Sequence, residues 1–138
     1  MKRLNRGAAE AVEAADAHAV TDITGFGFLG HAHEMAHLGL VNFRFEWEKL
    51  PWLPGARRYA EMGAFPGGMG RNRDYFAPWL TFAPAITDLM QNMLWTPETS
   101  GGLLAAVAPA QVATFQQHCP SAVVVGEVLE GDGRIEVV

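Results

Sequence analysis

The sequence predicts an α/β (α+β) domain in which helices pack on a mixed sheet. Short apolar or alternating segments, typical of strands, are interspersed with segments of helical periodicity. The last two expected strands, 122–129 and 134–138, are joined by Glu-Gly-Asp-Gly at 130–133, a sequence typical of a hairpin turn. Because a hairpin interrupts the regular alternation of strand and helix, a layered mixed sheet is favoured over a purely parallel one. The 138 residues have the size of one domain, so 1–138 is expected to be a single domain.

The first half of the chain is expected to alternate helices with strands. The first segment is rich in alanine, and the second has apolar residues at helical spacing until Gly39, which is expected to end it. Residues 41–47 alternate apolar and polar side chains, as in a half-buried strand. The expected elements are helices over 3–16, 28–38 and 55–62 and strands over 18–21 and 41–47.

The second half begins with a segment rich in glycine and arginine, 63–74, which is expected to be an irregular loop with unusual backbone angles. After it, 103–107 is uniformly apolar, as in a buried strand, and Pro109 suits the first turn of a following helix. The further expected elements are an extended segment over 79–82, helices over 84–93 and 110–118, a strand over 103–107 and the terminal hairpin.

Composition excludes several classes of function. Hydrophobic residues make up 49% of the chain and charged residues 18%, so we expect some apolar surface to face a partner or another domain. The net charge of −5, without a basic run, argues against nucleic-acid binding. Cys119 is the only cysteine, which fits an inert thiol in a reducing compartment. Without a bilayer-spanning run or a signal-peptide pattern, the expected location is the cytoplasm.

The most suggestive motif is Thr-Asp-Ile-Thr-Gly-Phe-Gly at 21–27, which combines a strand end, a glycine turn and a helix start. Free backbone N–H groups and the positive end of a helix dipole would gather there and attract an anion. The carboxylate of Asp22 would hold a hard cation beside it. An anion site next to a metal carboxylate suits a nucleotide triphosphate. The alternative is a plain turn in which Asp22 caps the helix.

Two further glycine segments have two interpretations each. The segment 66–73 would bring Asn72 and its flanking arginines to phosphate, or it is a solvated surface loop. Thr99-Ser100-Gly101-Gly102 would bring hydroxyl groups and close backbone to a ligand, or it only connects a helix to a strand.

His33, Glu34 and His37 have the His-Glu-x-x-His form of a zinc peptidase, with both histidines on one helix face. No third ligand is evident nearby, and the same helix has to bury Leu29 and Ala32. A solvated histidine pair is therefore the favoured interpretation, and zinc analysis of the purified protein would test the alternative.

Together these motifs resemble the C-terminal half of the selenophosphate synthetase (selenide, water dikinase) family, within the aminoimidazole ribonucleotide synthetase-like superfamily. The matching passages occur in the order of the family and cover nearly the whole chain. They are His-Ala-Val-Thr-Asp-Ile-Thr-Gly-Phe-Gly-Phe-Leu-Gly-His at 18–31, Pro-Gly-Ala at 54–56, Pro-Gly-Gly at 66–68 with Arg-Asn-Arg at 71–73, Pro-Glu-Thr-Ser-Gly-Gly-Leu-Leu at 97–104 and Gly-Glu-Val at 126–128.

The resemblance implies the C-terminal domain of a two-domain, cytoplasmic, ATP-dependent phosphotransferase. Such an enzyme converts ATP, selenide and water to selenophosphate, AMP and phosphate. It implies a mixed sheet covered by helices, distantly ferredoxin-like. The implied partner of this domain is the N-terminal domain of the same enzyme, absent here, and the full-length enzyme is expected to form a homodimer. Since the reacting cysteine or selenocysteine belongs to that N-terminal half, no catalytic residue and no activity are expected of this chain alone.

Site residues follow from the resemblance position by position. Asp22 resembles the aspartate that helps hold Mg²⁺ on the phosphates of ATP, and the histidines at 31–37 fall on an ordinary packing helix. The implied cofactor-binding residues are Thr24, Gly25, Gly27, Asn72, Thr99 and Ser100. The alternatives are the C-terminal domain of another ATP enzyme of the superfamily and a non-catalytic docking module.

Overall fold

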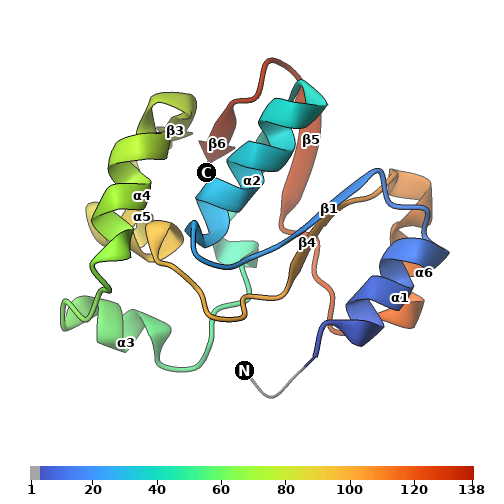
Figure 1. Ribbon diagram of the computed structural model, residues 1–138, viewed down its shortest axis with the longest axis horizontal. Coiled ribbons are helices and arrows are strands. Elements are labelled where there is room, and N and C mark those ends of the chain that lie inside the picture. The colour runs from blue at the N-terminus through green and yellow to red at the C-terminus, as the bar shows by residue number, and fades with distance from the viewer. Residues whose placement is uncertain (1–3) are drawn as a thin grey trace.

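The computed structural model describes residues 4–138, and within them two sheets are combined with six α-helices (Figure 1). The strands are β1 (Ala19–Asp22), β2 (Val41–Phe45), β3 (Leu80–Phe82), β4 (Leu103–Ala106), β5 (Gly126–Glu130) and β6 (Ile135–Val137). The helices are α1 (Arg6–Ala14), α2 (Gly27–Gly39), α3 (Ala56–Glu61), α4 (Gly68–Phe76), α5 (Asp88–Trp95) and α6 (Val112–His118). Short 3₁₀ turns are η1 (Trp47–Lys49), η2 (Ala77–Trp79) and η3 (Pro109–Gln111). The expected mixed α/β fold is confirmed.

Strands β1 and β4 form an antiparallel ribbon in which Asp22 lies opposite Leu103. The ribbon runs from the body of the domain to α1 and α6, which pack on each other at its far end (Figure 1). The start of the first expected helix, residue 3, lies outside the described residues. The ribbon therefore places the end of β1 at the junction between two packed groups of elements.

The other sheet has four strands in the order β3-β6-β2-β5. Strand β2 is antiparallel to β5 and parallel to β6, and β6 is parallel to β3. The predicted terminal hairpin is therefore wrong, because β2 lies between β5 and β6. The connection crosses the start of β2, where Oδ1 of Asn42 accepts bonds from the amides of Asp132 at 3.1 Å and Arg134 at 2.7 Å.

The predicted loop over 63–74 is also wrong, since helix α4 begins at Gly68. Asn72 and Phe76 lie one turn apart on one helix face, and both are buried. Burial of this face offsets the roughly 1 kcal/mol that each helical glycine costs relative to alanine. Tertiary packing, rather than local propensity, thus determines this element.

Several element boundaries also differ from the prediction. Helix α5 begins only at Asp88, where Oγ1 of Thr87 accepts a bond from the amide of Met90 at 3.4 Å. Helix α2 includes Gly39, and Leu40 with φ 51° follows it as the left-handed cap. The segment 122–125 precedes β5 without being part of it.

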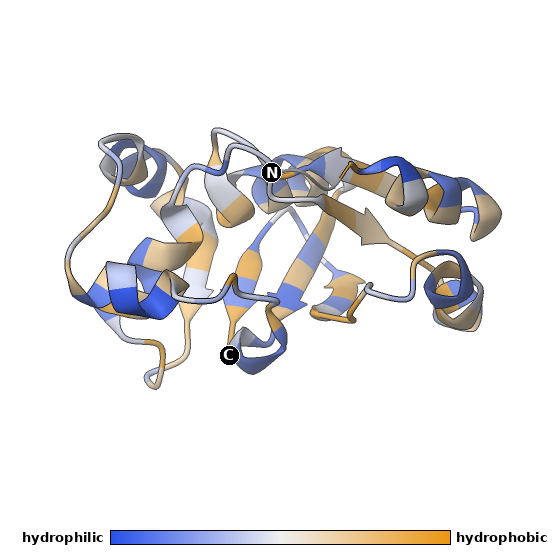
Figure 2. Cartoon of the chain, turned by 90° about the horizontal axis from the view of Figure 1, so that it is seen from below, coloured by the Kyte–Doolittle hydropathy of each residue, from blue (hydrophilic) through white to orange (hydrophobic). Residues whose placement is uncertain are grey.

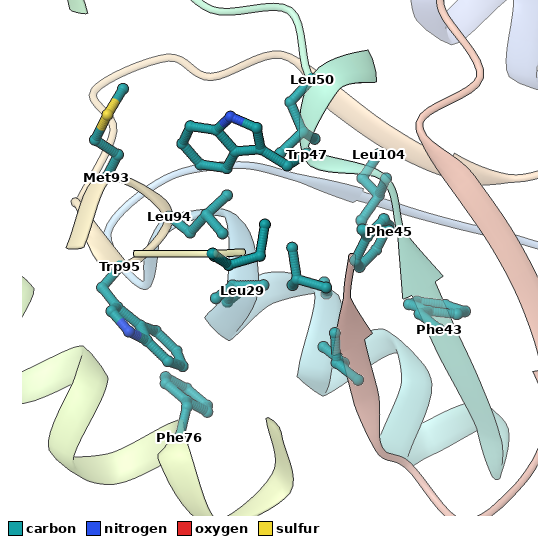
Figure 3. Packing of buried hydrophobic residues seen from close by; sticks show 14 of the residues in the cluster. Leu29, Phe43, Phe45, Trp47, Leu50, Phe76, Met93, Leu94, Trp95 and Leu104 are labelled. Carbon is teal, nitrogen blue, oxygen red and sulfur yellow. The ribbon is translucent and has the colours of Figure 1, made fainter. Parts of the chain in front are cut away.

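The core lies between α2, α5 and the four-stranded sheet (Figure 3). Phe28 on α2 contacts Phe45 on β2 with ring centroids 4.7 Å apart. Along β2 and β6, buried residues alternate with exposed charged ones, which matches the alternating hydropathy in Figure 2. The largest fully buried side chains are Trp95, Leu29, Leu94, Ile135 and Val137. Over 4–138, no helix has both the length and the apolar character that a membrane crossing needs.

Candidate functional site

Asp22 is the last residue of β1, and its side chain is exposed. It lies on an open groove between α1 and the ribbon, which is lined by Ala9, Val12, Glu13, Val20, Thr21, Asp22 and Leu103. Within 4–138, no hydrogen bond or ion pair engages the carboxylate of Asp22. Asp22 does not cap α2, because the N-cap position is Phe26 and no side chain caps that helix. The carboxylate is therefore free to bind a ligand.

The two glycine turns, 24–27 and 97–102, lie against each other. The amide of Glu98 donates to the carbonyl of Thr24 at 2.8 Å, and the amide of Gly101 donates to that of Ile23 at 2.9 Å. The amide of Ile23 in turn donates to the carbonyl of Gly102 at 2.9 Å. These three backbone bonds fix both turns as one unit at the end of the ribbon.

Close backbone packing requires glycine at position 27. Gly27 has φ 69°, and a Cβ there would lie 2.9 Å from the carbonyl oxygens of Trp95 and Thr96. Gly25 differs, since nothing lies within 4 Å of where its Cβ would be, and the residue is exposed. Gly27 is thus needed for packing between α2 and the end of α5, whereas the backbone at Gly25 is open to a ligand.

Asn72 is buried, and its side chain joins three segments. Its Nδ2 donates to the carbonyls of Gly25 and Trp95, both at 3.0 Å. Both amide hydrogens are therefore used inside the protein. In this structure Asn72 holds the first glycine turn through the carbonyl of Gly25. Its contact with a nucleotide remains a prediction.

Two further predicted residues, Thr99 and Ser100, are exposed in the second glycine turn. The turn carries them beside the paired segment 22–24, so the structure brings them to the same end of the ribbon as Asp22. Arg71 and Arg73 are exposed on α4.

Sequence reasoning missed His31, which is 8% exposed. Its Nε2 lies 3.0 Å from Oγ1 of Thr24 and 3.4 Å from the amide nitrogen of Phe26. Its Nδ1 lies 3.4 Å from Oε2 of Glu34. The spacing of His31 and Glu34, three residues apart on a helix, was the available signal.

Glu98 was also missed. It follows Pro97 in the second glycine turn and is half-buried. Burial raises the pKa of its carboxyl group above the ordinary value. A carboxyl group with a raised pKa beside a glycine turn adds a titratable group to the site.

The His-Glu-x-x-His segment does not have the arrangement of a zinc peptidase. The predicted solvated pair is wrong for His33, which is buried, stacks on Trp79 with centroids 4.6 Å apart, and has Nδ1 3.1 Å from the carbonyl oxygen of Gly133. Burial is the main cause that lowers the pKa of His33. His37 is exposed. Over residues 4–138, no cluster of three or more His, Cys, Asp or Glu side chains could hold a metal ion.

The fold and the paired glycine turns define a mixed α/β domain with a free carboxylate at the end of a strand. The family model described as "AIR synthase related protein, C-terminal domain" matches residues 1–138. The chain belongs to this family, which confirms the superfamily predicted from the motifs.

Proteins named selenide, water dikinase are similar to almost the whole chain. The one from Paraburkholderia xenovorans is 40% identical over 141 residues, covering 99% of this chain and 40% of its own length. The one from Pelobacter propionicus is 42% identical over 135 residues, covering 94% and 39%. The one from Clostridium botulinum is 36% identical over 142 residues, covering 99% and 41%. The chain thus spans about 40% of the length of these relatives.

Proposed function

We propose that this chain is the C-terminal domain of a selenide, water dikinase that converts ATP, selenide and water to selenophosphate, AMP and phosphate. Its partner is the N-terminal domain of the same enzyme, which supplies the reacting residue, and the full-length enzyme is a cytoplasmic homodimer. The observation that carries the proposal is the 36–42% identity to proteins of that name over 94–99% of the chain. The chain alone is expected to be inactive.

The role of Asp22 is to hold Mg²⁺ on the phosphates of ATP. Mg²⁺ prefers oxygen ligands, keeps several waters and needs only one or two protein carboxylates besides the phosphates. The exposed carboxylate of Asp22, which has no partner among residues 4–138, fits this requirement. When bound, the ion neutralises the charge that develops on the transferred phosphoryl group. A single carboxylate also implies weak metal binding by the isolated domain.

The glycine turns provide the rigid surroundings of that carboxylate. Three backbone bonds link the turns, and Asn72 supports the first of them. The open backbone at Gly25, with the exposed hydroxyl groups of Thr99 and Ser100, would contact the nucleotide. Phosphoryl transfer depends on positioning and charge neutralisation more than on covalent chemistry. A domain without a reacting residue can therefore contribute by positioning the nucleotide and its metal ion.

The test is a calorimetric titration with Mg-ATP of this chain alone, and then of this chain mixed with the N-terminal domain of the Paraburkholderia xenovorans relative. We expect binding and ATP turnover only in the mixture. Asp22→Asn should remove most of the turnover without lowering the melting temperature. Glu13→Gln, which changes another carboxylate of the same groove, should leave turnover close to that of the unaltered chain. If the Asp22 variant keeps a turnover as high as that of the Glu13 variant and of the unaltered chain, Asp22 is excluded from the site.

The competing function is a non-catalytic docking module. The open groove beside Asp22 includes the apolar side chains of Val12, Val20 and Leu103, which suits such a role as well. Stable association of the two domains without Mg-ATP binding would favour the docking module over the enzyme domain.

A further inference from the structure

His31 is a buried, titratable side chain to which the proposed function assigns no role. It lies in the first turns of α2 and contacts the first glycine turn on one side and Glu34 on the other. Its neighbours include the ring of Phe26, with centroids 5.3 Å apart. Which of its two nitrogens carries the proton determines what it can do.

The backbone amide of Phe26 determines the tautomer of the His31 ring. The amide proton of Phe26 points at Nε2 of His31, with the nitrogens 3.4 Å apart, so Nε2 carries the lone pair. The proton of the neutral ring then lies on Nδ1, which is 3.4 Å from Oε2 of Glu34. A carboxylate beside Nδ1 favours this tautomer. Glu34, which is exposed on the same helix, places its carboxylate beside Nδ1.

This tautomer also fixes the orientation of the hydroxyl group of Thr24. Since Nε2 of His31 accepts, Oγ1 of Thr24, 3.0 Å away, has to donate its only proton to it. Oγ1 then has only lone pairs left for any further partner. A group of this kind accepts bonds from a water molecule or contacts a cation, but it cannot donate to a phosphate oxygen.

Thr24 lies two residues after Asp22, the proposed metal ligand. Ile23 is buried, whereas Asp22 on one side is exposed and Thr24 on the other is partly exposed. Asp22 and Thr24 therefore flank a buried residue, and both reach the surface at the end of β1. An acceptor oxygen two residues after a free carboxylate complements a hydrated cation.

We infer that His31, with Glu34 beside its Nδ1, is a positioning residue that makes Thr24 an acceptor for the waters of a cation bound at Asp22. The inference rests on the proposed function for the identity of that cation, Mg²⁺ carried by ATP. Thr24 then belongs to the metal side of the site, and its hydroxyl group does not contact the phosphates. Water-mediated contacts of this kind are nearly as favourable as direct ones.

The first test is nitrogen-15 NMR of the histidine rings in the 138-residue chain at about pH 8, where an ordinary histidine is neutral. We expect His31 to carry its proton on Nδ1. The Nε2 resonance should shift in Thr24→Val, which removes the hydroxyl group, and stay in place in Thr24→Ser. A proton on Nε2, or an unchanged Nε2 resonance in Thr24→Val, would overturn the inference.

The second test is a double-mutant cycle on Mg-ATP affinity in the mixture with the N-terminal domain. Thr24→Val and His31→Leu should each weaken affinity about tenfold, which equals roughly 1.4 kcal/mol, and together little more than either alone. His31→Gln, which keeps an acceptor at this position, should recover most of the affinity. His37→Leu, at an exposed position on the same helix, is the control. A loss of about a hundredfold in the double variant would mean that the residues act independently.

The two proposals fail in different ways. If the unaltered mixture binds no Mg-ATP, the proposed function is wrong, and the NMR result still decides whether His31 orients Thr24. If Mg-ATP binds but Thr24→Val weakens metal-free ATP as much as Mg-ATP, the hydroxyl group contacts the nucleotide itself, and the inference is wrong while the proposed function stands.

Discussion

Asn72 holds the carbonyl group of Gly25 in place with a 3.0 Å hydrogen bond between residues 47 positions apart in the chain. The same Nδ2 also binds the carbonyl of Trp95, so one amide joins α4, the first glycine turn and the end of α5. Because Asn72 is buried, water cannot easily replace it. The turn that carries the candidate site therefore depends on a residue that sequence reasoning assigned to a loop.

Asn72→Ala is expected to lower the free energy of unfolding by about 2 kcal/mol, because it leaves two carbonyl groups without their shared donor. Asn72→Asp should cost more, since a carboxylate would face the same two carbonyls. Urea denaturation measures both changes. Arg73→Ala, at the exposed neighbouring position, should change stability by no more than about 0.5 kcal/mol. Equal midpoints for the alanine variants at 72 and 73 would contradict the proposed support.

Gly27 and Gly25 offer a matched pair of substitutions. Gly27→Ala should cost about 2 kcal/mol or more, because φ 69° disfavours a side chain and the new Cβ would meet the carbonyl of Trp95. Gly25→Ala places its Cβ in open space and should change stability by only about 0.5 kcal/mol. Thermal unfolding of the two variants compares them directly. Similar losses would mean that packing at Gly27 is looser than the structure indicates.

The motifs of the candidate site could be predicted from the sequence, whereas their pairing could not. Residues 21–27 were recognised as a strand end, glycine turn and helix start, and the structure confirms that order. Contact with 97–102, however, depends on the antiparallel register that places Asp22 opposite Leu103. No local signal encodes a register between segments so far apart in the chain. The metal and nucleotide roles remain predictions.

The two incorrect fold predictions have one cause, namely that local signals were outweighed by burial. The sequence of 130–133 suits a hairpin, yet Ile135 and Val137 gain more by pairing with β2 and β3 in the buried centre of the sheet. Likewise, glycine disfavours a helix over 68–70, but burial of Asn72 and Phe76 outweighs that cost. His31 has one local partner, Glu34, but its contact with Thr24 lies outside the helix and has no signal in the helical spacing.

Glu98→Gln is expected to raise stability at neutral pH. Burial raises the pKa of Glu98, so the folded state binds the proton more tightly than the unfolded state does. The protonated Glu98 contributes fully to the free energy of unfolding below the ordinary pKa of 4.5, and this contribution is lost as pH rises through the higher pKa of the folded state. Glutamine stays neutral and removes this loss. The difference between the urea midpoints at about pH 4 and about pH 7 should therefore be smaller in Glu98→Gln than in the unaltered chain. Glu48→Gln, at an exposed position, is the control and should leave the difference unchanged.

The pH dependence of unfolding should also report on His33. Its neutral ring stacks on Trp79 and lies 3.1 Å from the carbonyl oxygen of Gly133, and burial lowers its pKa below the ordinary 6.5. The stabilising contribution is complete above the unfolded pKa of 6.5, and it is lost as pH falls from there through the lower pKa of the folded state. The sign follows because the unfolded state takes up the proton first.

His33→Asn keeps an amide donor near the position of Nδ1 but does not titrate. This variant should be less stable than the unaltered chain by about 1–3 kcal/mol at pH 8, because the stacked ring is lost. The difference in free energy of unfolding between the two proteins should become smaller below about pH 6.5, because only the unaltered chain loses stability there. His37→Asn, at the exposed position one turn further on, should retain most of the pH dependence, because burial of His33 is the main cause of its lowered pKa and the charge of His37 a smaller one. Urea midpoints of the three proteins across this range measure the effect. A constant gap at every pH would mean that His33 titrates alike in the folded and unfolded states, contrary to its burial against Trp79 and Phe76.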